Sequence, residues 1–518
     1  MMSAQKIMCT VVVKVDVIIA VHNAQETIEE TVKSAMHQEI PAHLLTSLSN
    51  VKFDVVVCCY DDASTDKSID LLYTLKKEDC ANASLRESKL MNTTLLIGAA
   101  AGGSPARGAG YARNQAVKLR DVITSNTNDD DDEAKCFHFL CILDSDDIMH
   151  PTRIAEQTSA MLILGYGKQH GKHLSEKALM GCQFDRIPND STWHYATWAN
   201  SLSDERVVLE QFRECTLLQP TWFLSKSWFD SLGGWLNAPI TDEEMNKLKN
   251  ADSSTYYRLV HSSELSDTIS SGVTASTLRL AEDTRLLYAH LRAEGTVHLH
   301  RTSAPLVSYR HRVGMSQSSG TPRKLLMQLR TKAWEDIIFF GKQGTGSNAS
   351  VWSKHGFVIW GAGRDGKDFL KALTPEVASR VVCFVDVDCN KIEKIKFYDN
   401  PSIGRRVPIL HFSMLAKNSV ACDVDGVVFG RVSKEKKLGD TFDTEKQIGT
   451  NPKCEEPKRK KHKSQSKDKA MQGTSIDPNV LPHLPVVVCV AMYRTNGALE
   501  SNVASIGRTE GKDLWHLC

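Results

Sequence analysis

Residues Cys141–Pro151 read C-I-L-D-S-D-D-I-M-H-P and join an apolar run to an acidic cluster. The apolar run ends at Leu143, and the carboxylates Asp144, Asp146 and Asp147 follow it. A buried strand with this ending places its acidic side chains at the carboxyl edge of a sheet, where α/β proteins bind ligands. Carboxylates suit a hard cation such as Mg²⁺ or Mn²⁺, which one or two of them can hold together with substrate phosphates. The pattern predicts a metal–diphosphate site; the alternative is a solvated acidic turn with Asp147 as a helix cap.

The composition is that of an ordinary globular protein. The chain has 518 residues, enough for two or three domains, with 41% hydrophobic and 24% charged residues. A net charge of +1 gives no indication of a polyanionic partner. None of the 14 cysteines forms a C-x-x-C pair, which argues against a zinc ribbon and favours small buried thiols in a reducing compartment.

The apolar N-terminal stretch over residues 11–21 is broken by Lys14 and Asp16. It is too short and too charged for a transmembrane helix, and no small-residue cleavage site follows it. We therefore expect it to be the first strand of a cytoplasmic protein without a membrane partner.

Strands and helices are expected to alternate through the first part of the chain. Alternation of this kind predicts a mostly parallel, doubly wound α/β sheet. The expected strands are 15–21, 53–59, 93–97 and 136–143, and the expected helices are 24–38, 68–77 and 108–119.

A second α/β unit begins with an expected strand at 357–360 and the glycine turn G-A-G-R-D-G at 361–366. A helix over 367–373 and a strand over 381–386 follow, and a late strand is expected at 485–492. The turn fits a Rossmann fingerprint, with Asp386 as the ribose-binding acid about 20 residues on. An NAD(P)-dependent unit is therefore one interpretation. A docking or RNA-binding module is the other, and we favour it because no second chemistry is visible.

Polar and charged segments divide the chain. We expect a first domain over residues 1–340, with insertions near 122–134 and 237–277, and a second domain over residues 351–518. An insertion at 432–480 is charged and poor in aromatic residues, so it is expected to be disordered.

Two motifs adjoin the expected parallel strands. Y-D-D-A-S-T-D-K-S (60–68) follows the second strand, where a carboxylate can accept hydrogen bonds from a base or a ribose. The alternative is a turn that caps the next helix, for which Ser64 and Asp66 are suited. R-G-A-G-Y-A-R-N-Q-A (107–116) begins a helix with glycines and arginines, which favours phosphate binding unless the arginines simply face solvent.

Two later motifs add an acidic pair and a histidine. L-A-E-D-T-R-L (280–286) places Glu282 and Asp283 at the start of an amphipathic helix, either as partners of the helix dipole or with one of them as a general base. S-Y-R-H-R-V-G-M-S (308–316) contributes His311, a candidate ligand of metal or diphosphate or else a structural histidine.

The motifs A-V-H-N, D-D-x-S-x-D, R-G-x-G-x-x-R-N, L-D-x-D-D, E-D and Y-R-H occur in this order between about residues 14 and 330. This series resembles the GT-A glycosyltransferases of family 2. The resemblance implies a doubly wound nucleotide-sugar-binding domain, followed here by the smaller Rossmann-like α/β domain. It also implies inverting, UDP-sugar-dependent hexosyl transfer with a divalent cation, Mn²⁺ or Mg²⁺.

Carried over residue by residue, the resemblance implies that Asp283 is the catalytic base, supported by Glu282. It implies that Asp146 is the direct metal ligand, with Asp144 and His311 beside it. Two positions depart from the family pattern: Ala20 replaces a usual proline, and His311 lies one residue closer to Tyr309–Arg310 than in the common Y-R-x-H spacing. The donor-binding residues implied are Ala20, Val21, His22, Asn23, Asp61, Asp62 (which would read the uracil), Arg107, Arg113, Asp144 and Ser145.

A closer resemblance covers nearly the whole chain apart from the insertions. W-A-N-S-L (198–202), P-T-W-F (220–223), the segment 357–367 and the tail E-G-K-D-L-W-H (510–516) are similar to the queuosine-tRNA galactosyltransferases, also described as β-1,3-N-acetylglucosaminyltransferase-like proteins. This resemblance implies transfer of galactose from UDP-galactose to queuosine in cytoplasmic tRNA-Tyr.

Stacking of anticodon-loop bases on aromatic side chains would make Trp222 and Trp198 acceptor-binding residues, with a place in the core as the alternative. Two other functions stay open. One is UDP-GlcNAc-dependent β-1,3-N-acetylglucosaminyl transfer to a glycan. The other is a non-catalytic RNA- or nucleotide-binding protein in which the carboxylates are inert.

Overall fold

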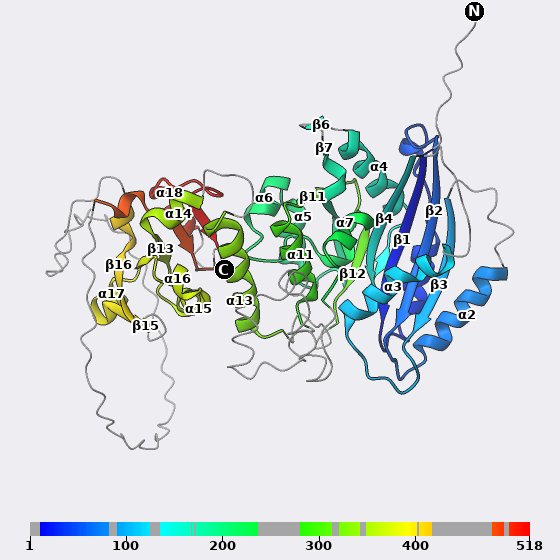
Figure 1. Cartoon of the computed structure of the whole chain (residues 1–518), viewed down its shortest axis with the longest axis horizontal. Coiled ribbons are helices and arrows are strands. Elements are labelled where there is room, and N and C mark those ends of the chain that lie inside the picture. Colours follow the sequence, from blue (N-terminus) through cyan, green and yellow to red (C-terminus); the bar gives the residue numbers. More distant parts are fainter. Residues whose placement is uncertain are drawn as a thin grey trace, which may run out of the picture.

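The computed structural model describes residues 11–81, 91–124, 135–166, 168–169, 172–236, 280–312, 321–341, 349–400, 404–416, 479–491 and 497–517. Within these residues the strands form two large sheets, one of seven strands and one of six. Figure 1 shows the first sheet at one end of the molecule and the second at the other, with helix α13 (Arg323–Trp334) between them.

The first sheet is mostly parallel. Its order is β11-β8-β10-β4-β1-β2-β3. Strands β4, β1, β2 and β3 run parallel, β10 is antiparallel to both of its neighbours, and β11 is parallel to β8. The strands are β1 (Val11–Val21), β2 (Val51–Asp61), β3 (Met91–Ala99), β4 (Lys135–Asp144), β8 (Ala178–Cys182), β10 (Phe223–Ser225) and β11 (Thr296–His300).

Strand β1 is largely buried on both faces, as expected for a parallel strand covered on both sides, although one face carries Lys14 and Asp16. Val13, Val15 and Val17 contribute to one buried cluster, whereas Ile18 contributes to the other. On the first side lie α1 (Ile28–Met36), α2 (Ser68–Ala81) and α4 (Arg153–Tyr166). On the other lie α3 (Ala109–Thr124), α7 (Lys226–Ser231) and α11 (Glu282–Arg292). The prediction of a doubly wound α/β fold is confirmed.

The register of the parallel strands brings three strand ends together. Val21 of β1 lies beside Asp61 of β2, and Ala20 of β1 lies beside Asp144 of β4. The acidic ends of β2 and β4 therefore flank the end of β1, at the edge where doubly wound sheets bind ligands.

A small three-stranded sheet covers this edge. It consists of β5 (Ile148–Met149), β12 (Val307–Arg310) and β9 (Phe184–Ile187), in that order. Pairing of Ser308 with Ile148 places the Y-R-H segment next to the acidic turn. The remaining elements of this part are η1 (Ala42–Leu44), β6 (Lys168–Gln169), β7 (Lys172–His173), η3 (Leu174–Lys177), α5 (Trp193–Ser201), α6 (Asp204–Leu209) and η4 (Gln219–Thr221).

The second sheet has the order β15-β16-β14-β13-β17-β18, and only the β15–β16 pair is antiparallel. The expected strands at 357–360 and 381–386 are confirmed, and the late strand returns to this sheet beside β13. Its strands are β13 (Phe357–Trp360), β14 (Val381–Asp386), β15 (Phe397–Asn400), β16 (Arg405–His411), β17 (Val486–Val488) and β18 (Leu514–His516). Its helices are α14 (Ala349–His355), α15 (Arg364–Ala372), α16 (Pro375–Ala378), α17 (Cys389–Ile395), η7 (Phe412–Leu415), η8 (Leu481–His483) and α18 (Ala498–Ser505).

The two sheets share one hydrophobic core. Helix α13 continues into a π-helical turn, η6 (Glu335–Phe339), and its Trp334 ring lies 5.2–5.5 Å from the rings of Trp352, Phe357 and Phe369. A single buried cluster runs from β1 through Trp334 to β18. At the C-terminal end, Arg206 of α6 pairs with Glu510.

Several expectations lie outside the described residues: most of the insertion near 122–134, the insertion at 237–277, and nearly all of the insertion at 432–480. Cys58, Cys59, Cys141, Cys383 and Cys489 are buried, as expected for small apolar thiols. In the described part of the chain, no helix has both the length and the apolar character needed to cross a bilayer.

A buried ion cluster in the first sheet gives a stability prediction. Asp16 is 0% exposed; its carboxylate lies 2.5 Å from Nε of Arg120 and 2.8 Å from Nε2 of His138. Asp54 also pairs with Arg120, but its side chain is 43% exposed. We expect Asp16→Ala to lower the free energy of unfolding by about 3–5 kcal/mol, because it leaves a buried guanidinium without its main partner. Asp54→Ala should cost less than about 1 kcal/mol. Equal urea midpoints for the two variants would contradict this.

Candidate active site

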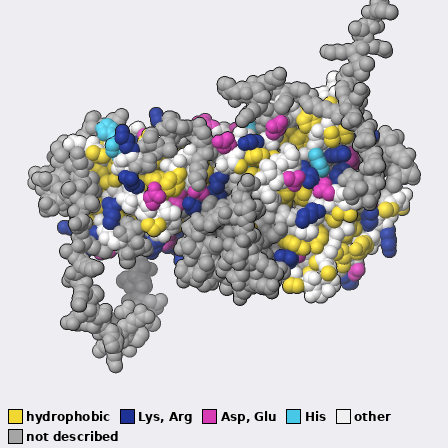
Figure 2. Space-filling view, in the orientation of Figure 1, with side chains coloured by type: hydrophobic (Ala, Val, Ile, Leu, Met, Phe, Trp, Pro, Cys, Tyr) yellow, Lys and Arg dark blue, Asp and Glu magenta, His cyan; other side chains and the backbone are white. Residues whose placement is uncertain are grey.

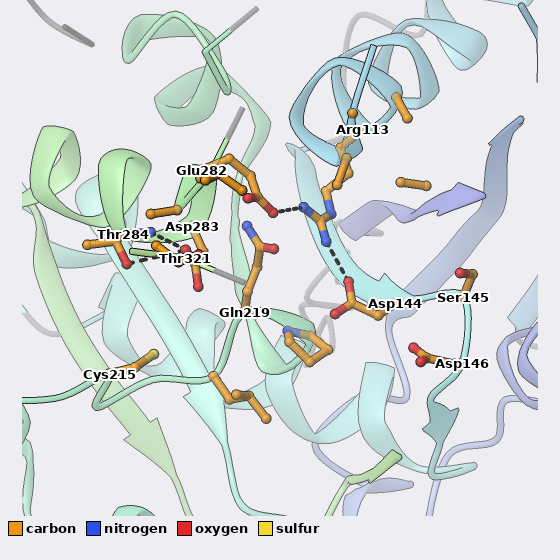
Figure 3. A pocket seen from close by; sticks show the side chains of 18 of the residues that line it. Arg113, Asp144, Ser145, Asp146, Cys215, Gln219, Glu282, Asp283, Thr284 and Thr321 are labelled. Atoms are coloured by element: carbon orange, nitrogen blue, oxygen red, sulfur yellow. Dashed lines mark hydrogen bonds and ion pairs between the residues drawn. The ribbon is translucent and has the colours of Figure 1, made fainter. Parts of the chain in front are cut away.

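A cavity of about 710 Å³ lies at the carboxyl edge of the first sheet. Residues far apart in the sequence meet there, and Figure 3 shows how several of their side chains lie. Most of the predicted site residues line this cavity: Ala20, Val21, His22, Asn23, Asp62, Arg113, Asp144, Ser145, Asp146, Trp222, Glu282, Asp283 and His311. Asp61, Arg107 and Trp198 are not among the lining residues.

Arg113 joins the two acidic motifs. Its guanidinium donates to Asp144 Oδ1 at 2.6 Å and to Glu282 Oε1 at 2.8 Å, and its side chain is only 5% exposed. Burial disfavours the charged guanidinium, but the charges of Asp144 and Glu282 outweigh this and hold the pKa of Arg113 above its usual value. The buried cation therefore connects β4, α3 and α11 at one point.

Glycine makes this junction possible. A Cβ on Gly110, in the first turn of α3, would lie 3.2 Å from Cβ of Trp235 and 3.4 Å from Cβ of Glu282. The start of α3 can therefore approach the start of α11 closely only without a side chain there. Ala281, just before α11, has a φ of 55°, a left-handed conformation that costs free energy in a residue with a Cβ.

One carboxylate oxygen of Asp62 accepts hydrogen bonds from two backbone N–H groups, and the other oxygen is unpaired among the described residues. Its Oδ2 accepts hydrogen bonds from the backbone N–H groups of Arg107 at 2.8 Å and Gly108 at 2.6 Å. Its Oδ1 is buried and has no hydrogen-bond partner among the described residues. An oriented carboxylate with a spare acceptor is suited to an N–H group of a ligand.

The neighbouring residues make contacts within the protein, although Asp61 Oδ1, like Asp62 Oδ1, is buried without a partner among the described residues. Asp61 Oδ2 accepts from the backbone N–H of Ser64 at 3.0 Å, and Asp66 Oδ1 accepts from the N–H of Ser68 at the start of α2. The Arg107 guanidinium lies 4.4 Å from the centre of the Tyr111 ring. Helix capping therefore falls on Asp66, whereas an unpaired acceptor that a ligand could use lies on Asp62.

The acidic turn after β4 is crowded with carboxylates. Burial, and then the charge of Asp144, raise the pKa of Asp146. Asp147 is fully buried, and its Oδ1 accepts from the backbone N–H of Arg310 at 2.8 Å. Burial, followed by the charges of Asp144 and Asp146, raises its pKa as well. The alternative in which Asp147 is a solvated helix cap is therefore wrong. Asp147 is buried and its hydrogen bond with Arg310 joins β12 to the turn.

The predicted metal ligands are close to arginines. Across the described ranges, no three His, Cys, Asp or Glu residues gather into a metal-binding group. Asp144 pairs with Arg113, and Asp146 lies 3.6 Å from Nε of Arg312. Two carboxylates whose repulsion a cation would relieve still fit Mg²⁺ or Mn²⁺, which bind by one or two carboxylates plus phosphate oxygens.

Asp283 lies across the cavity from Asp144 (Figure 3). Its Oδ1 accepts from the backbone N–H of Thr284 at 2.6 Å and from the Thr284 hydroxyl at 3.2 Å. Burial, and then the charge of Glu282, raise the pKa of Asp283 to about 6. A carboxylate with a pKa near neutral is well matched to general base catalysis. Glu282, by contrast, is engaged with Arg113.

The two predicted acceptor tryptophans differ. Trp222 lines the cavity but is 1% exposed, and its indole N–H donates to the carbonyl of Leu217. Trp198 packs between the Tyr195 ring, 5.8 Å away, and Arg213, away from the cavity lining.

Sequence reasoning missed further lining residues. Arg312 adjoins the predicted His311, and its guanidinium beside Asp146 could have been expected from the repeated arginines of Y-R-H-R. Gln219 directly precedes the P-T-W-F segment but is not part of it, and Glu214 and Arg330 lie in segments without a motif, so no sequence pattern indicated these residues.

In the second sheet, the acidic residue beside the glycine turn is hydrogen-bonded within the protein. The Asp386 carboxylate accepts from the N–H of Ala362 at 3.0 Å, the N–H of Asp388 at 3.1 Å and the Lys391 ammonium at 2.8 Å. A Cβ on Gly366 would lie 2.0 Å from the carbonyl oxygen of Gly361, so this glycine serves helix–strand packing. The acid that would bind a ribose is thus already engaged by the protein.

Comparison with known proteins gives distant structural likenesses. No family model matches the sequence. The chain is similar to S. aureus TarS 1-349 in complex with UDP-GlcNAc, at 13% identity and a TM-score of 0.37, over 71% of this chain and 84% of that one. It is also similar to mannosyltransferase PcManGT from Pyrobaculum calidifontis in complex with GDP-Man and Mn²⁺, at 13% identity and a TM-score of 0.30, over 62% and 61%. M. tuberculosis glucosyl-3-phosphoglycerate synthase matches at 15% identity and a TM-score of 0.23, over 65% and 84%. The α/β architecture of this chain is established by its own strand order and register.

Proposed function

We propose that this protein is a glycosyltransferase that moves a hexose from a nucleotide sugar to an acceptor hydroxyl. The observation that supports this most is one cavity that contains the unpaired Asp62 oxygen, the Arg113–Asp144 pair and Asp283. These groups supply, in that order, a base-reading acceptor, a site for a diphosphate and a general base.

The chain's own residues account for each requirement of a single displacement. Asp62 Oδ1 accepts a hydrogen bond from an N–H of the base, as a uracil ring offers. Arg113 and Arg312 attract the diphosphate. Asp283 removes the proton of the acceptor hydroxyl while its oxygen bonds to the anomeric carbon, and the diphosphate leaves with the electrons of the broken bond. Attack opposite the leaving group inverts the anomeric carbon, in keeping with Asp283 lying across the cavity from Asp144.

Asp146 and Asp144 would hold a divalent cation, Mn²⁺ or Mg²⁺, which when bound offsets the charge that develops on the departing diphosphate. Arg310 donates from Nε to the backbone carbonyl of Asp146 at 2.8 Å, and Nε of Arg312 lies 3.6 Å from its carboxylate, so both arginines help to fix the turn.

We further propose that the donor is UDP-galactose and the acceptor is queuosine in tRNA-Tyr. Support comes from the motif resemblance along the chain and from the size of the cavity, about 710 Å³, whose lining also includes Glu214, Cys215, Tyr288 and Arg330. On the face drawn in Figure 2, the Lys and Arg side chains are interspersed with Asp and Glu. Recognition of an RNA there would use local contacts with phosphates rather than one broad basic surface.

The residues around Asp146 give a metal prediction. Asp146→Ala should abolish sugar transfer, and EDTA should do the same to the unaltered protein. The binding of UDP, measured by calorimetry, should tighten with Mn²⁺ in the unaltered protein but not in Asp146→Ala. Asp185→Ala, an exposed change on β9, is the matched control and should retain both properties. Undiminished transfer in EDTA would refute the metal role.

Asp283 gives a prediction for the base. Asp283→Asn should keep its affinity for UDP but lower turnover by about a hundredfold or more, the usual scale for loss of a general base. Turnover of the unaltered protein should fall as the pH drops through about 6, because the carboxyl is protonated below its pKa. A loss of UDP binding with undiminished turnover of bound donor would show that Asp283 is structural.

The stability of the same variant provides a control that does not depend on activity. The pKa of Asp283 is about 6 in the folded chain and about 4 when unfolded, so the folded form binds the proton more tightly. The charged carboxylate therefore destabilises the folded state as the pH rises above this interval. Asp283→Asn should be more stable than the unaltered protein by up to about 3 kcal/mol at pH 8, with no such gain at pH 4.

The nucleosides of tRNA test the donor and acceptor together. Deleting the gene should convert galactosyl-queuosine in tRNA-Tyr to plain queuosine, and the purified protein with UDP-galactose should restore it in vitro. Mass spectrometry of digested tRNA measures both changes. Unchanged nucleosides after deletion, together with transfer of GlcNAc to a glycan in vitro, would establish the alternative acceptor.

A further inference from the structure

Gln219 is a buried amide whose nitrogen is left without a partner inside the cavity. The residue is 5% exposed, lines the cavity, and its Nε2 has no hydrogen-bond partner in the part of the chain that the structure describes. A buried donor in this state costs free energy unless a ligand or water accepts from it.

The backbone around Gln219 is held firmly. Its carbonyl accepts from the N–H of Trp222 at 3.0 Å, and the next residue, Pro220, restricts the chain at the start of η4. The carbonyl of Thr221 in turn accepts from the Gln157 amide at 3.0 Å. The backbone that carries the Gln219 side chain is thus fixed in position, as is required of a residue that binds a ligand specifically.

Gln157 shows what a structural glutamine looks like in the same region. It is 0% exposed, its Oε1 accepts from Arg153 at 2.8 Å, and its Nε2 donates to Thr221. Both ends of that amide are satisfied by the protein. Gln219 is nearly as inaccessible, at 5% exposure, but its Nε2 has no partner among the described residues, so packing alone does not account for it.

The position of Gln219 identifies what it would contact. In Figure 3 its amide lies between Asp283 on one side and the Arg113–Asp144 pair on the other. In the proposed displacement the anomeric carbon lies between the acceptor oxygen, held at Asp283, and the departing diphosphate, held near Arg113 and Asp144. The space that the Gln219 amide faces is therefore the space of the transferred sugar.

We infer that Gln219 is a specificity-determining residue that donates a hydrogen bond from Nε2 to a ring hydroxyl of the transferred hexose. This inference rests on the proposed function and adds a residue that reads the sugar. The hydroxyl oxygen supplies the acceptor that the buried N–H groups lack, so a donor sugar without that hydroxyl leaves the amide unpaired.

The test uses the full-length chain with Gln219→Met, which keeps the length of the side chain and removes the donor. UDP affinity should be unchanged, whereas kcat/KM with UDP-galactose should fall about ten- to a hundredfold. The Tm should be equal or higher, because an unpaired buried polar group is removed. Gln183→Met is the matched control: this half-buried glutamine lies outside the cavity lining, and its substitution should leave kcat/KM within about twofold.

Monodeoxy UDP-galactose donors, each lacking one ring hydroxyl, locate the bond. For one of them the penalty of Gln219→Met should disappear, because the partner of the amide is already absent. An equal penalty with every deoxy donor, or a kcat/KM within about twofold of the unaltered protein, would overturn the inference while leaving sugar transfer established. An unaltered protein that neither binds UDP nor transfers any sugar would overturn the proposed function, and this inference with it.

Discussion

The buried guanidinium of Arg113 is the contact on which both the fold and the site depend. It bonds to Asp144 at the end of β4 and to Glu282 at the start of α11. Glu282 follows Arg113 by 169 positions in the sequence. An arginine with 5% exposure is stable only while its charge is balanced, so each carboxylate fixes the position of the other. The same contact places Asp283, the next residue along α11, across the cavity from the acidic turn.

The elements that could be predicted from the sequence are those with a regular pattern of buried residues. The apolar strands that end at Asp61 and Asp144 predicted the parallel sheet. Because the carboxyl ends of parallel strands meet at one edge, these strands also predicted where the acidic residues lie. The small sheet that carries Arg310 was not predictable, since its strand β5 has only two residues and no periodicity. Gln219 was missed for a similar reason: its role follows from an unpaired atom, which sequence does not record.

Three features of the cavity lining work against stability. Ala281 adopts a left-handed backbone, Asp62 keeps an unpaired buried oxygen, and burial beside Glu282 raises the pKa of Asp283. Elsewhere in the first sheet, a charge as deeply buried as Asp16 is paired on both oxygens. Strain and unpaired polar groups at a cavity are expected where a ligand supplies the missing contacts.

The second sheet contributes to the cavity through helix α13. Leu326 and Arg330 line the cavity, and Trp334, one turn beyond Arg330, lies in the aromatic core of the second sheet. The next residue, Glu335, accepts hydrogen bonds from the backbone N–H and hydroxyl of Thr374 at the start of α16. A helix anchored in this way holds Leu326 and Arg330 in place in the cavity wall, because close packing restricts its movement. The second sheet can therefore influence the part of the cavity wall that α13 forms.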